Sequence, residues 1–415
     1  MKTIAIIGSG ISGLTCAYLL SQQHEVTLFE AGERLGGHTA TVDVELPGES
    51  LTVDTGFIVF NDWTYPNFNK LLGRIGVQRQ ATEMSFSVQN PVTGVEYNGN
   101  NLDTLFAQRR NLLNVRFYLF LSEILRFNRL TKSTLQRTGF RDGDTLGEFL
   151  HENDFSQYFA EHYILPMVAA IWSASVDAAR QFPLGLFLRF FEHHGLLNVI
   201  KRPQWYVIKG GSRSYIPHLV EPVQHIRLNS SVDKVLRDAN GVAVDSRGER
   251  EIFDEVILAC HSDQALKILG DRTDSEGDIL GGLKYRGNEV VLHTDESLLP
   301  TSRKAWASWN FWLGGDDRLP PTVTYNMNIL QGIRSRQTLC VTLNDTARID
   351  PEKILGVYHY DHPVFDLNTV AAQSRREEIC GEKHTHFCGA YWYNGFHEDG
   401  VRSALDVCQR FGVAL

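Results

Sequence analysis

The first thirty residues change their hydrophobic period in a way that predicts a strand, a glycine turn, a helix and a second strand. Residues 3–7 (TIAII) are a short apolar run, residues 14–23 (LTCAYLLSQQ) have the spacing of a helix, and residues 25–30 (EVTLFE) are a second apolar run. No Asp, Glu, Lys or Arg lies between Thr3 and His24, as in a leader peptide. The glycines inside this stretch would each weaken a continuous helix by about 1 kcal/mol. The pattern therefore favours strand–turn–helix–strand over a leader peptide.

The rest of the chain alternates between helix-like and mixed stretches. Residues 63–204 read as helical, whereas residues 263–375 are mixed and contain the strand-like segments 289–294 (EVVLHT) and 338–343 (TLCVTL). The longest later stretch without a charged residue, from Tyr163 to Val176, is shorter than the ~20 residues that a membrane-spanning helix needs.

Length, charge and cysteine usage narrow the classes of protein to consider. A chain of 415 residues predicts two or three domains, and 43% hydrophobic residues are enough for a large core. The net charge of -9 argues against a general nucleic-acid binder, which needs a basic surface. The six cysteines are scattered without a C-x-x-C pair, so we expect neither a disulfide framework nor a zinc site, and we predict a cytoplasmic protein.

The turn after the first predicted strand has the spacing G-x-G-x-x-G, formed by Gly8, Gly10 and Gly13. Gly8 permits a tight turn, Gly10 lets the backbone approach a pyrophosphate, and Gly13 lets the helix pack close to the strand. Glu30 ends the second predicted strand, where an acid accepts ribose hydroxyls and repels the 2′-phosphate of NADP. The motif predicts a dinucleotide site and leaves NAD and FAD open.

The residues after Glu30 resemble the flavin-containing amine oxidase superfamily, which includes amine oxidases, protoporphyrinogen oxidase and phytoene-type desaturases. The resemblance rests on "AGERLGGHTATV", with Arg34 before two glycines, and on "LTVDTGFIVF", with Asp54 and Gly56. It implies FAD as the cofactor. In this part of the chain it implies cofactor contacts by Ser12, Arg34, Gly36, Gly37, His38, Thr39 and Gly56.

Three later stretches follow the same family plan. Residues 207–219 resemble its internal Gly-Gly segment, and residues 225–235 with 253–260 resemble a strand pair in which Val232 contacts adenine. In the terminal "HFCGAYWYNGFHEDGVRSALDVC" a strand ends at Cys388–Gly389, and a helix is expected to begin near Gly400, with Asp399 as its N-cap. Such a helix N-terminus would stabilise negative charge on a reduced flavin. The implied cofactor contacts here are Gly389, Asp399, Gly400 and Val401.

We therefore predict an α/β fold with a split Rossmann-like FAD-binding domain and an inserted mixed α+β substrate domain. Residues 1–62, 205–262 and 376–415 are assigned to the FAD-binding domain, and residues 63–204 and 263–375 to the substrate domain.

A narrower resemblance covers essentially the whole chain. Stretches such as "VTYNMNILQ", "YHYDHPVFD" and "FCGAYWYNGFHEDG" resemble a bacterial group of NAD/FAD-binding oxidoreductases similar to the N-terminal flavoprotein half of plant cyclopropane-fatty-acid synthases. Two stretches depart from the superfamily. Asn288 and Glu289 stand where amine oxidases often carry a lysine that holds water near flavin N5, and Tyr391 replaces an acid that binds the ribityl chain.

The substrate side offers fewer signals. Eight basic residues and one acid, Glu123, lie between Thr104 and Arg141, among bulky apolar residues. This segment, 104–141, is either a membrane-surface contact or a core helix with solvated arginines. Residues 182–191 (FPLGLFLRFF) either line a lipid tunnel or belong to the core.

Histidine and cysteine side chains complete the candidates for chemistry. His397 is the candidate catalytic residue, which orients substrate or moves a proton, with a loop-anchoring role as the alternative. The other histidine groups lack metal-ligand spacing, so we predict no metal. Cys388 lies where a covalent flavin link is conceivable, although burial is the simpler role.

The sequence thus favours an FAD-dependent oxidoreductase that dehydrogenates or desaturates a fatty acyl chain or another lipid. An amine oxidase is one alternative, and a non-catalytic FAD-binding partner of a lipid-modifying methyltransferase is another. Peripheral contact with the inner face of the membrane stays open as an addition to the cytoplasmic prediction.

Overall fold

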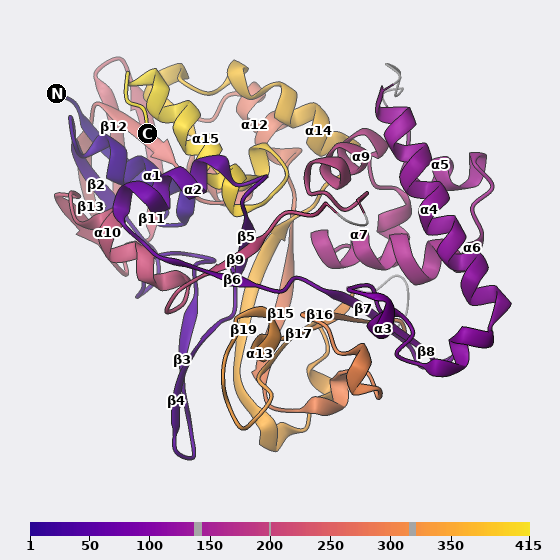
Figure 1. Cartoon of the computed structure of the whole chain (residues 1–415). Helices are drawn as coiled ribbons and strands as arrows, with labels where there is room; N and C mark the ends of the chain where they lie inside the picture. The colour runs from indigo at the N-terminus through magenta and orange to yellow at the C-terminus, as the bar shows by residue number, and fades with distance from the viewer. Residues whose placement is uncertain (137–142, 199–200, 315–320) are drawn as a thin grey trace.

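The computed structural model describes residues 1–136, 143–198, 201–314 and 321–415. It consists of two parts joined by a long pair of strands, β15 (Tyr285–His293) and β19 (Ile354–Pro363) (Figure 1). No helix in the described ranges is both long enough and apolar enough to cross a membrane.

Five parallel strands form the centre of the first part. In sheet order they are β10 (His225–Arg227), β2 (Glu25–Phe29), β1 (Thr3–Ile7), β14 (Glu255–Leu258) and β20 (Thr385–Phe387). The central strands β1 and β14 are short and buried along almost their whole length, because helices and a second sheet cover both faces. They come from the beginning, middle and end of the chain, and the predicted α/β fold is confirmed.

Helices cover one face of this sheet. Helix α15 (His397–Arg410) packs along α1 (Ile11–Leu20), with α10 (Ile216–Val220) and α2 (Pro66–Ile75) beside them. The sheet and these helices share one apolar core. The carboxyl ends of the parallel strands meet at one edge, which is where ligands bind in sheets of this type.

A three-stranded antiparallel sheet packs against the parallel one. It contains β11 (Val232–Asp238), β12 (Gly241–Ser246) and β13 (Glu249–Phe253). The expectation that β11 and β14 form a strand pair is wrong. The turns after β11 and β12 fold the chain back on itself, so β11 pairs with β12 instead, and β14 lies between β1 and β20.

A seven-stranded sheet forms the centre of the second part. Its order is β19, β15, β18 (Cys340–Leu343), β17 (Thr322–Asn326), β16 (Trp309–Trp312), β7 (Phe86–Asn90) and β8 (Val95–Asn98). All neighbours are antiparallel except β16 and β7. Strands β15 and β19 pair along their whole length from Tyr285 to His293, and their Tyr285 end reaches the first part.

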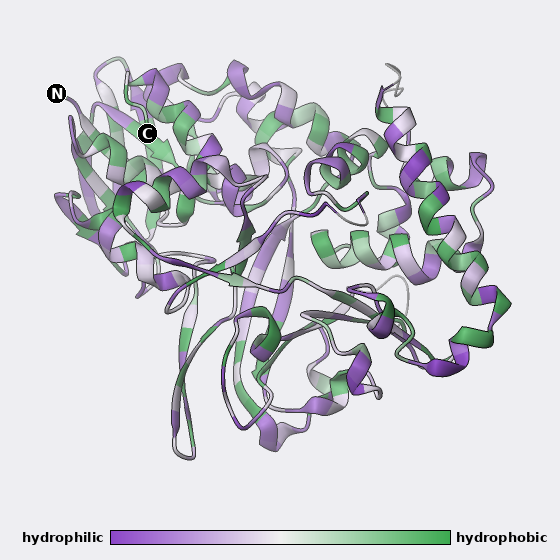
Figure 2. Cartoon of the chain, viewed as in Figure 1, coloured by the Kyte–Doolittle hydropathy of each residue, from purple (hydrophilic) through white to green (hydrophobic). Residues whose placement is uncertain are grey.

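A helical layer packs beside this sheet around a core rich in phenylalanine. Its main helices are α4 (Val115–Gln136), α5 (Leu146–Glu152), α7 (Leu165–Trp172), α8 (Val176–Arg180) and α9 (Leu184–His193). Helix α7 is apolar throughout and lies on the inner side of the layer, whereas α4 lies on the outer edge (Figures 1 and 2).

The expectation that residues 63–204 are helical holds for most of the segment but is wrong at its start. Strands β7 and β8 lie there, and so does β6 (Arg79–Thr82), which joins β5 (Val59–Asn61) and β9 (Trp205–Ile208) in a small sheet. These strands are three to five residues long, and β6 and β7 each pair with a strand more than 100 residues away. Their local sequence therefore shows little of the alternation of apolar and polar residues that predicts a strand.

Candidate active site

One large cavity connects the two parts of the molecule. Its volume is about 850 Å³, which is near the upper end of the range for ligand pockets. The glycine loop after β1 lines one end, and side chains of the helical layer line the other. Of the predicted site residues, those that line it are Gly8, Gly10, Ser12, Glu30, Gly36, Gly37, His38, Gly56, Val232, Gly389 and His397.

The three motif glycines have distinct structural roles. A Cβ on Gly13 would lie 1.9 Å from the Gly8 carbonyl oxygen, so only glycine lets α1 approach the turn this closely. Gly8 has a φ of +103°, which other residues rarely adopt. A Cβ on Gly10, by contrast, would meet no protein atom within 4 Å. Gly10 therefore leaves open space at the first turn of α1, whose N–H groups attract phosphate.

Glu30 is fixed at the same end of the cavity. One carboxylate oxygen accepts hydrogen bonds from the Ser9 amide at 3.1 Å and from the Ser9 hydroxyl, and the other accepts from the Gly32 amide at 2.8 Å. The oxygen that accepts only from the Gly32 amide keeps a further lone pair for a ribose hydroxyl. Val232 lines the cavity together with Ser230 and Ser231, so this end is suited to a nucleoside.

The second glycine segment lies beside the first. A Cβ on Gly37 would lie 3.3 Å from the Gly10 Cα, and the Gly36 amide donates to the Ser9 carbonyl oxygen at 3.1 Å. Arg34 does not line the cavity. Its guanidinium donates to the Gly37 and Thr39 carbonyl oxygens at 2.9 and 3.1 Å and fixes the course of the segment instead.

Asp54 joins the N-terminal segment to the internal Gly-Gly segment. Its Oδ1 accepts hydrogen bonds from the amide and the hydroxyl of Ser212, each at 2.9 Å, and from the Thr41 hydroxyl at 2.6 Å. Burial raises the pKa of Asp54 to about 6 despite these bonds. This aspartate is therefore a structural anchor behind the cavity wall.

Helix α15 begins three residues earlier than expected. Its first residue is His397, and Phe396 takes the N-cap position. Asp399 is therefore not the N-cap; it lies in the first turn, and its carboxylate accepts from the Phe396 amide at 2.9 Å. Neither Asp399, Gly400 nor Val401 lines the cavity. Burial raises the pKa of Asp399 to about 7.

Gly400 lets α15 lie close to α1. A Cβ at this position would lie 2.6 Å from the Ile11 side chain, and the Gly400 carbonyl oxygen accepts from the Ser12 hydroxyl at 2.9 Å. Val401 is fully buried in the core between the helices. Gly400 and Val401 thus place the N-terminus of α15 at the cavity without facing it themselves.

His397 faces the cavity but is held on several sides. Its ring is stacked on Phe57 with the centroids 3.5 Å apart, and its Nε2 lies 2.7 Å from the Tyr215 hydroxyl. The same hydroxyl is bonded to Thr39. Burial keeps the pKa of His397 well below its usual value, so the ring is neutral. These contacts favour the anchoring role over proton transfer.

Three further histidines gather where β15 and β19 reach the first part. The ring centroid of His38 lies 6.0 Å from that of His261 and 5.6 Å from that of His362. Burial lowers the pKa of His38 to about 3, that of His362 to about 4, and that of His261 below its usual value. Among the described residues no three His, Cys, Asp or Glu side chains are arranged to hold a metal ion.

The residues of the cavity fit FAD. His38 Nε2, His261 Nδ1 and the Tyr391 hydroxyl are buried without a hydrogen-bond partner among the described residues, and all three side chains line the cavity. Buried polar atoms of this kind usually have a ligand or water as partner. These atoms can form hydrogen bonds with the polar groups of a dinucleotide, and the open space at Gly10 can accommodate its phosphates.

The structure shows the positions of the residues that depart from the superfamily, Asn288, Glu289 and Tyr391. Asn288 and Glu289 both bond to Asn344, and neither lines the cavity. The only lysine among the described lining residues is Lys267, which lies at the nucleoside end next to Gln264. Tyr391 does line the cavity and can offer its hydroxyl where the superfamily has an acid.

Cys388 is buried in the core of the first part. Its sulfur lies 3.9 Å from that of Cys16 on α1, and it does not line the cavity. The expectation that burial is its role is confirmed, and the geometry gives no support to a covalent flavin link at this residue.

The end of the cavity formed by the second part is mainly apolar and aromatic. Its lining residues include Met84, Ile171, Trp172, Phe190, Leu196, Trp205, Trp309, Tyr325 and Leu330. Residues 182–191, predicted as tunnel lining or core, contribute Phe190 to the cavity, while Phe187 and Leu188 lie in the core.

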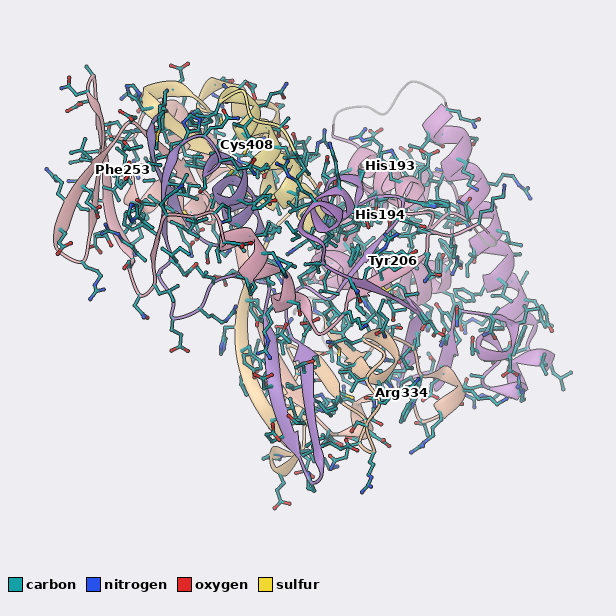
Figure 3. The ribbon with its side chains drawn as sticks, turned by 60° about the vertical axis from the view of Figure 1, so that its left-hand side comes forward. His193, His194, Tyr206, Phe253, Arg334 and Cys408 are labelled. Carbon is teal, nitrogen blue, oxygen red and sulfur yellow. The ribbon has the colours of Figure 1, made fainter. Side chains whose placement is uncertain are left out.

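Two polar residues of this end were missed by the sequence analysis as site residues. His194 follows α9, and its ring is stacked on Phe190 with the centroids 3.8 Å apart. Figure 3 shows His194 between the end of the molecule that carries Phe253 and the outer helices. Arg202 also lines the cavity, and its Nε donates to the Asn198 carbonyl oxygen at 3.0 Å. Nothing in the local sequence distinguishes either residue from an ordinary surface group.

Comparison with known proteins gives a consistent picture. The sequence model of the flavin-containing amine oxidoreductases matches residues 11–276. An L-amino acid oxidase from Cerastes cerastes is 51% identical over 41 residues, which cover 10% of this chain and only 8% of that protein.

Solved structures share the fold over the whole chain. A fatty acid isomerase from P. acnes that produces CLA has a TM-score of 0.71 and 16% identity, covering 98% of both chains. Cyclohexylamine oxidase from Brevibacterium oxydans IH-35A has a TM-score of 0.70 and 17% identity, covering 99% of both chains. A putrescine oxidase bound to putrescine has a TM-score of 0.69 and 15% identity, again covering 99% of both.

Proposed function

The chain belongs to the flavin-containing amine oxidoreductase family, and we propose that it removes hydrogen from the carbon chain of a fatty acyl group or another lipid. Membership confirms that the protein is an FAD-dependent oxidoreductase, as expected from the sequence. When bound, FAD accepts a hydride and passes the electrons on to oxygen or a carrier. The substrate is the part that we propose.

The lining of the substrate end is the observation that carries this proposal. Between residues 165 and 205, the described lining residues are mostly apolar and include one cation, Arg202, and no carboxylate. The lining carboxylates elsewhere are Glu30 and Asp233 at the nucleoside end and Asp361 beside the three clustered histidines. A long apolar pocket with one exposed cation suits a molecule with an apolar chain and an anionic head.

His194 is placed to receive the proton that must leave the substrate. Its Nδ1 lies 3.0 Å from the Phe190 carbonyl oxygen, which can only accept, so Nδ1 carries the hydrogen. Its Nε2 therefore holds a free lone pair, and burial lowers the pKa of His194 to about 4, which keeps the ring neutral at physiological pH.

The reaction balances with these groups. A segment R–CH2–CH2–R′ becomes R–CH=CH–R′ when a hydride leaves one carbon and a proton leaves the next. The apolar walls hold the chain and exclude water, and His194 Nε2 takes the proton. The departing hydride makes the neighbouring C–H bond strongly acidic, so a weakly basic imidazole is sufficient.

Amine oxidation is the second candidate, because two of the similar structures are amine oxidases. The aromatic rings of the cavity, among them Trp172 and Tyr391, could hold an ammonium ion by cation–π contacts. An association with a lipid-modifying methyltransferase stays a prediction that co-purification would test.

Anaerobic mixing experiments distinguish the candidates. The purified yellow protein would be mixed without oxygen with fatty acids, with phospholipids, and with mono- and polyamines, while the flavin absorbance is followed. We expect bleaching by a lipid and a product lighter by two hydrogens in mass spectra. Bleaching by amines together with an unchanged lipid would refute the proposal.

A further inference from the structure

The outer face of the α4 region carries apolar side chains that the protein does not cover. Helix α4 buries Phe117, Phe120 and Phe127 in the helical layer. On its other side and in the preceding turn of helix (Arg109–Leu113), Leu113 is 92% exposed and Val115 is 73% exposed. An amphipathic helix that only completes a core would place polar residues at these positions.

These apolar side chains form one surface. Val115, Tyr118 and Leu119 have the spacing i, i+3 and i+4, which places them on the same face of α4. Leu119 is 60% exposed, and the Tyr118 hydroxyl donates to the Leu112 carbonyl oxygen at 3.0 Å, which joins the helix to the preceding turn. We call this surface the α4 patch; it comprises Leu112, Leu113, Val115, Tyr118 and Leu119.

The segment that carries the patch is basic although the chain is acidic overall. Arg109, Arg110 and Arg116 lie in the same segment, and no acid occurs between Thr104 and Ser122. Nearby, Asp103 is paired with both Arg109 and Lys304, so the cations outnumber it. The net charge of the whole chain is -9. This local reversal of sign complements an anionic surface.

The same helix leads to the mouth of the cavity. Near the other end of α4, the Lys132 ammonium donates to the Asn198 side chain at 2.7 Å. The Asn198 carbonyl oxygen accepts from Arg202, which lines the cavity. A ligand surface at the start of α4 is thus connected through one rigid helix to the substrate end. Helix α4 lies at the outer edge of the molecule, where a flat surface can reach it (Figure 1).

We propose that the α4 patch docks on the surface of a membrane that contains anionic lipids. The leucine and valine side chains enter the boundary between headgroups and acyl chains, and the arginines contact the headgroup phosphates. A membrane fits better than a protein partner because the exposed residues are mainly aliphatic and share their segment with three arginines, Arg109, Arg110 and Arg116. Of the predicted basic run, Arg137 and Arg141 lie outside the described residues and are not needed. The proposal holds whether the substrate is a lipid or an amine.

Vesicle sedimentation tests the docking. The holoprotein would be incubated with vesicles of phosphatidylcholine alone and with vesicles that also contain phosphatidylglycerol. We expect binding to the anionic vesicles, at least tenfold weaker binding to the neutral ones, and weakening by salt. Replacing Leu113→Glu and Leu119→Glu together should reduce binding to the anionic vesicles at least tenfold. Both residues are exposed, so the variant should keep its fold and its flavin.

A matched control uses two exposed apolar residues elsewhere. Ile252 is 64% exposed on β13, and Val357 is 45% exposed on β19. The double variant Ile252→Glu with Val357→Glu adds the same charge and should bind anionic vesicles like the unchanged protein. Equal loss of binding in both variants would mean that net charge alone is responsible and would overturn the docking site. Self-association that the Leu113 and Leu119 substitutions abolish, without vesicle binding, would assign the patch to a second copy of the chain instead.

Discussion

His397 Nε2 and the Tyr215 hydroxyl lie 2.7 Å apart, although the two residues are separated by 182 positions in the chain. The same hydroxyl is bonded to Thr39. One phenol therefore ties together the N-terminal, internal and C-terminal segments of the FAD-binding part. Because His397 also faces the cavity, this tie fixes a cavity wall as well as the fold.

We expect Tyr215→Phe to destabilise the protein and weaken its hold on FAD. The substitution leaves Thr39 and His397 without their shared partner, and a lost buried hydrogen bond of this kind costs about 1–3 kcal/mol. Denaturant titration would measure the free energy of unfolding, and filtration would measure the flavin retained. Tyr206→Phe is the control, because Tyr206 is only partly buried. Unchanged stability of Tyr215→Phe would contradict the proposed tie.

Asp399 should make the protein less stable as the pH rises from about 4 to 7. Burial raises the pKa of Asp399 to about 7, so the folded state keeps a proton that the unfolded state releases above about 4. Between these values, this group alone lowers the free energy of unfolding by at most about 1.4 kcal/mol per pH unit. Asp399→Asn removes the titration but can still accept from the Phe396 amide. Its advantage over the unchanged protein should therefore grow with pH, and equal slopes in denaturant titrations would exclude the effect.

Replacement by alanine should impair different properties at Gly10 and Gly13: FAD binding at Gly10 and stability at Gly13. Gly10→Ala has room in the protein, so it should fold normally, yet its methyl group occupies the space left for the cofactor phosphates. Gly13→Ala places a carbon against the Gly8 carbonyl oxygen, so it should lose stability or fail to fold. Thermal unfolding without FAD and titration with FAD measure the two effects separately. Normal FAD affinity in Gly10→Ala would show that the cofactor does not approach this residue.

Local features of the sequence were sufficient to predict the strand–turn–helix–strand unit whose loop lines one end of the cavity. Gly8, Gly10, Gly13 and Glu30 lie within one strand–turn–helix–strand unit, whose geometry follows from short-range rules. The start of α15 was misplaced because His397 and Glu398 lack the features of a helix start, while Asp399 looks like a cap. In the structure the Asp399 carboxylate accepts a hydrogen bond from the amide of the N-cap residue Phe396. Asp399 is therefore the third residue of the helix and not its cap.

Features that depend on distant segments could not be read from one sequence. His38, His261 and His362 are brought together by the ends of β15 and β19, and no local pattern links them. The tautomer of His194 is set by its hydrogen bond to the Phe190 carbonyl oxygen, and its role depends on the cavity that it lines. The sequence predicted the α4 segment as apolar and basic, but only the structure shows which apolar residues remain uncovered.

His194→Gln should lower the rate of substrate oxidation by a factor of about 10² or more, if His194 Nε2 accepts the proton. Flavin content and spectrum should stay unchanged, because the residue lies at the substrate end. The active form is neutral, so the rate of the unchanged protein should fall only as the pH drops through about 4. His193→Gln is the control, since His193 is exposed and adjacent. Flavin reduction in rapid mixing is the measurement, and an undiminished rate in His194→Gln would remove the residue from the mechanism.

Arg202→Met should reveal whether the substrate carries an anionic head. Arg202 is the cation at the substrate end, and a charge-assisted hydrogen bond to a carboxylate or phosphate contributes about 1.5–3 kcal/mol. We therefore expect KM for an anionic lipid to rise by about tenfold to a hundredfold, with kcat little changed, because the head lies away from the reacting carbons. An uncharged ester of the same lipid should bind both proteins equally. Lys201→Met removes the neighbouring charge, which does not line the cavity, and should leave KM unchanged. If Arg202→Met instead improves the oxidation of amines and leaves lipids unaffected, the cation repels the natural substrate, and amine oxidation becomes the better assignment.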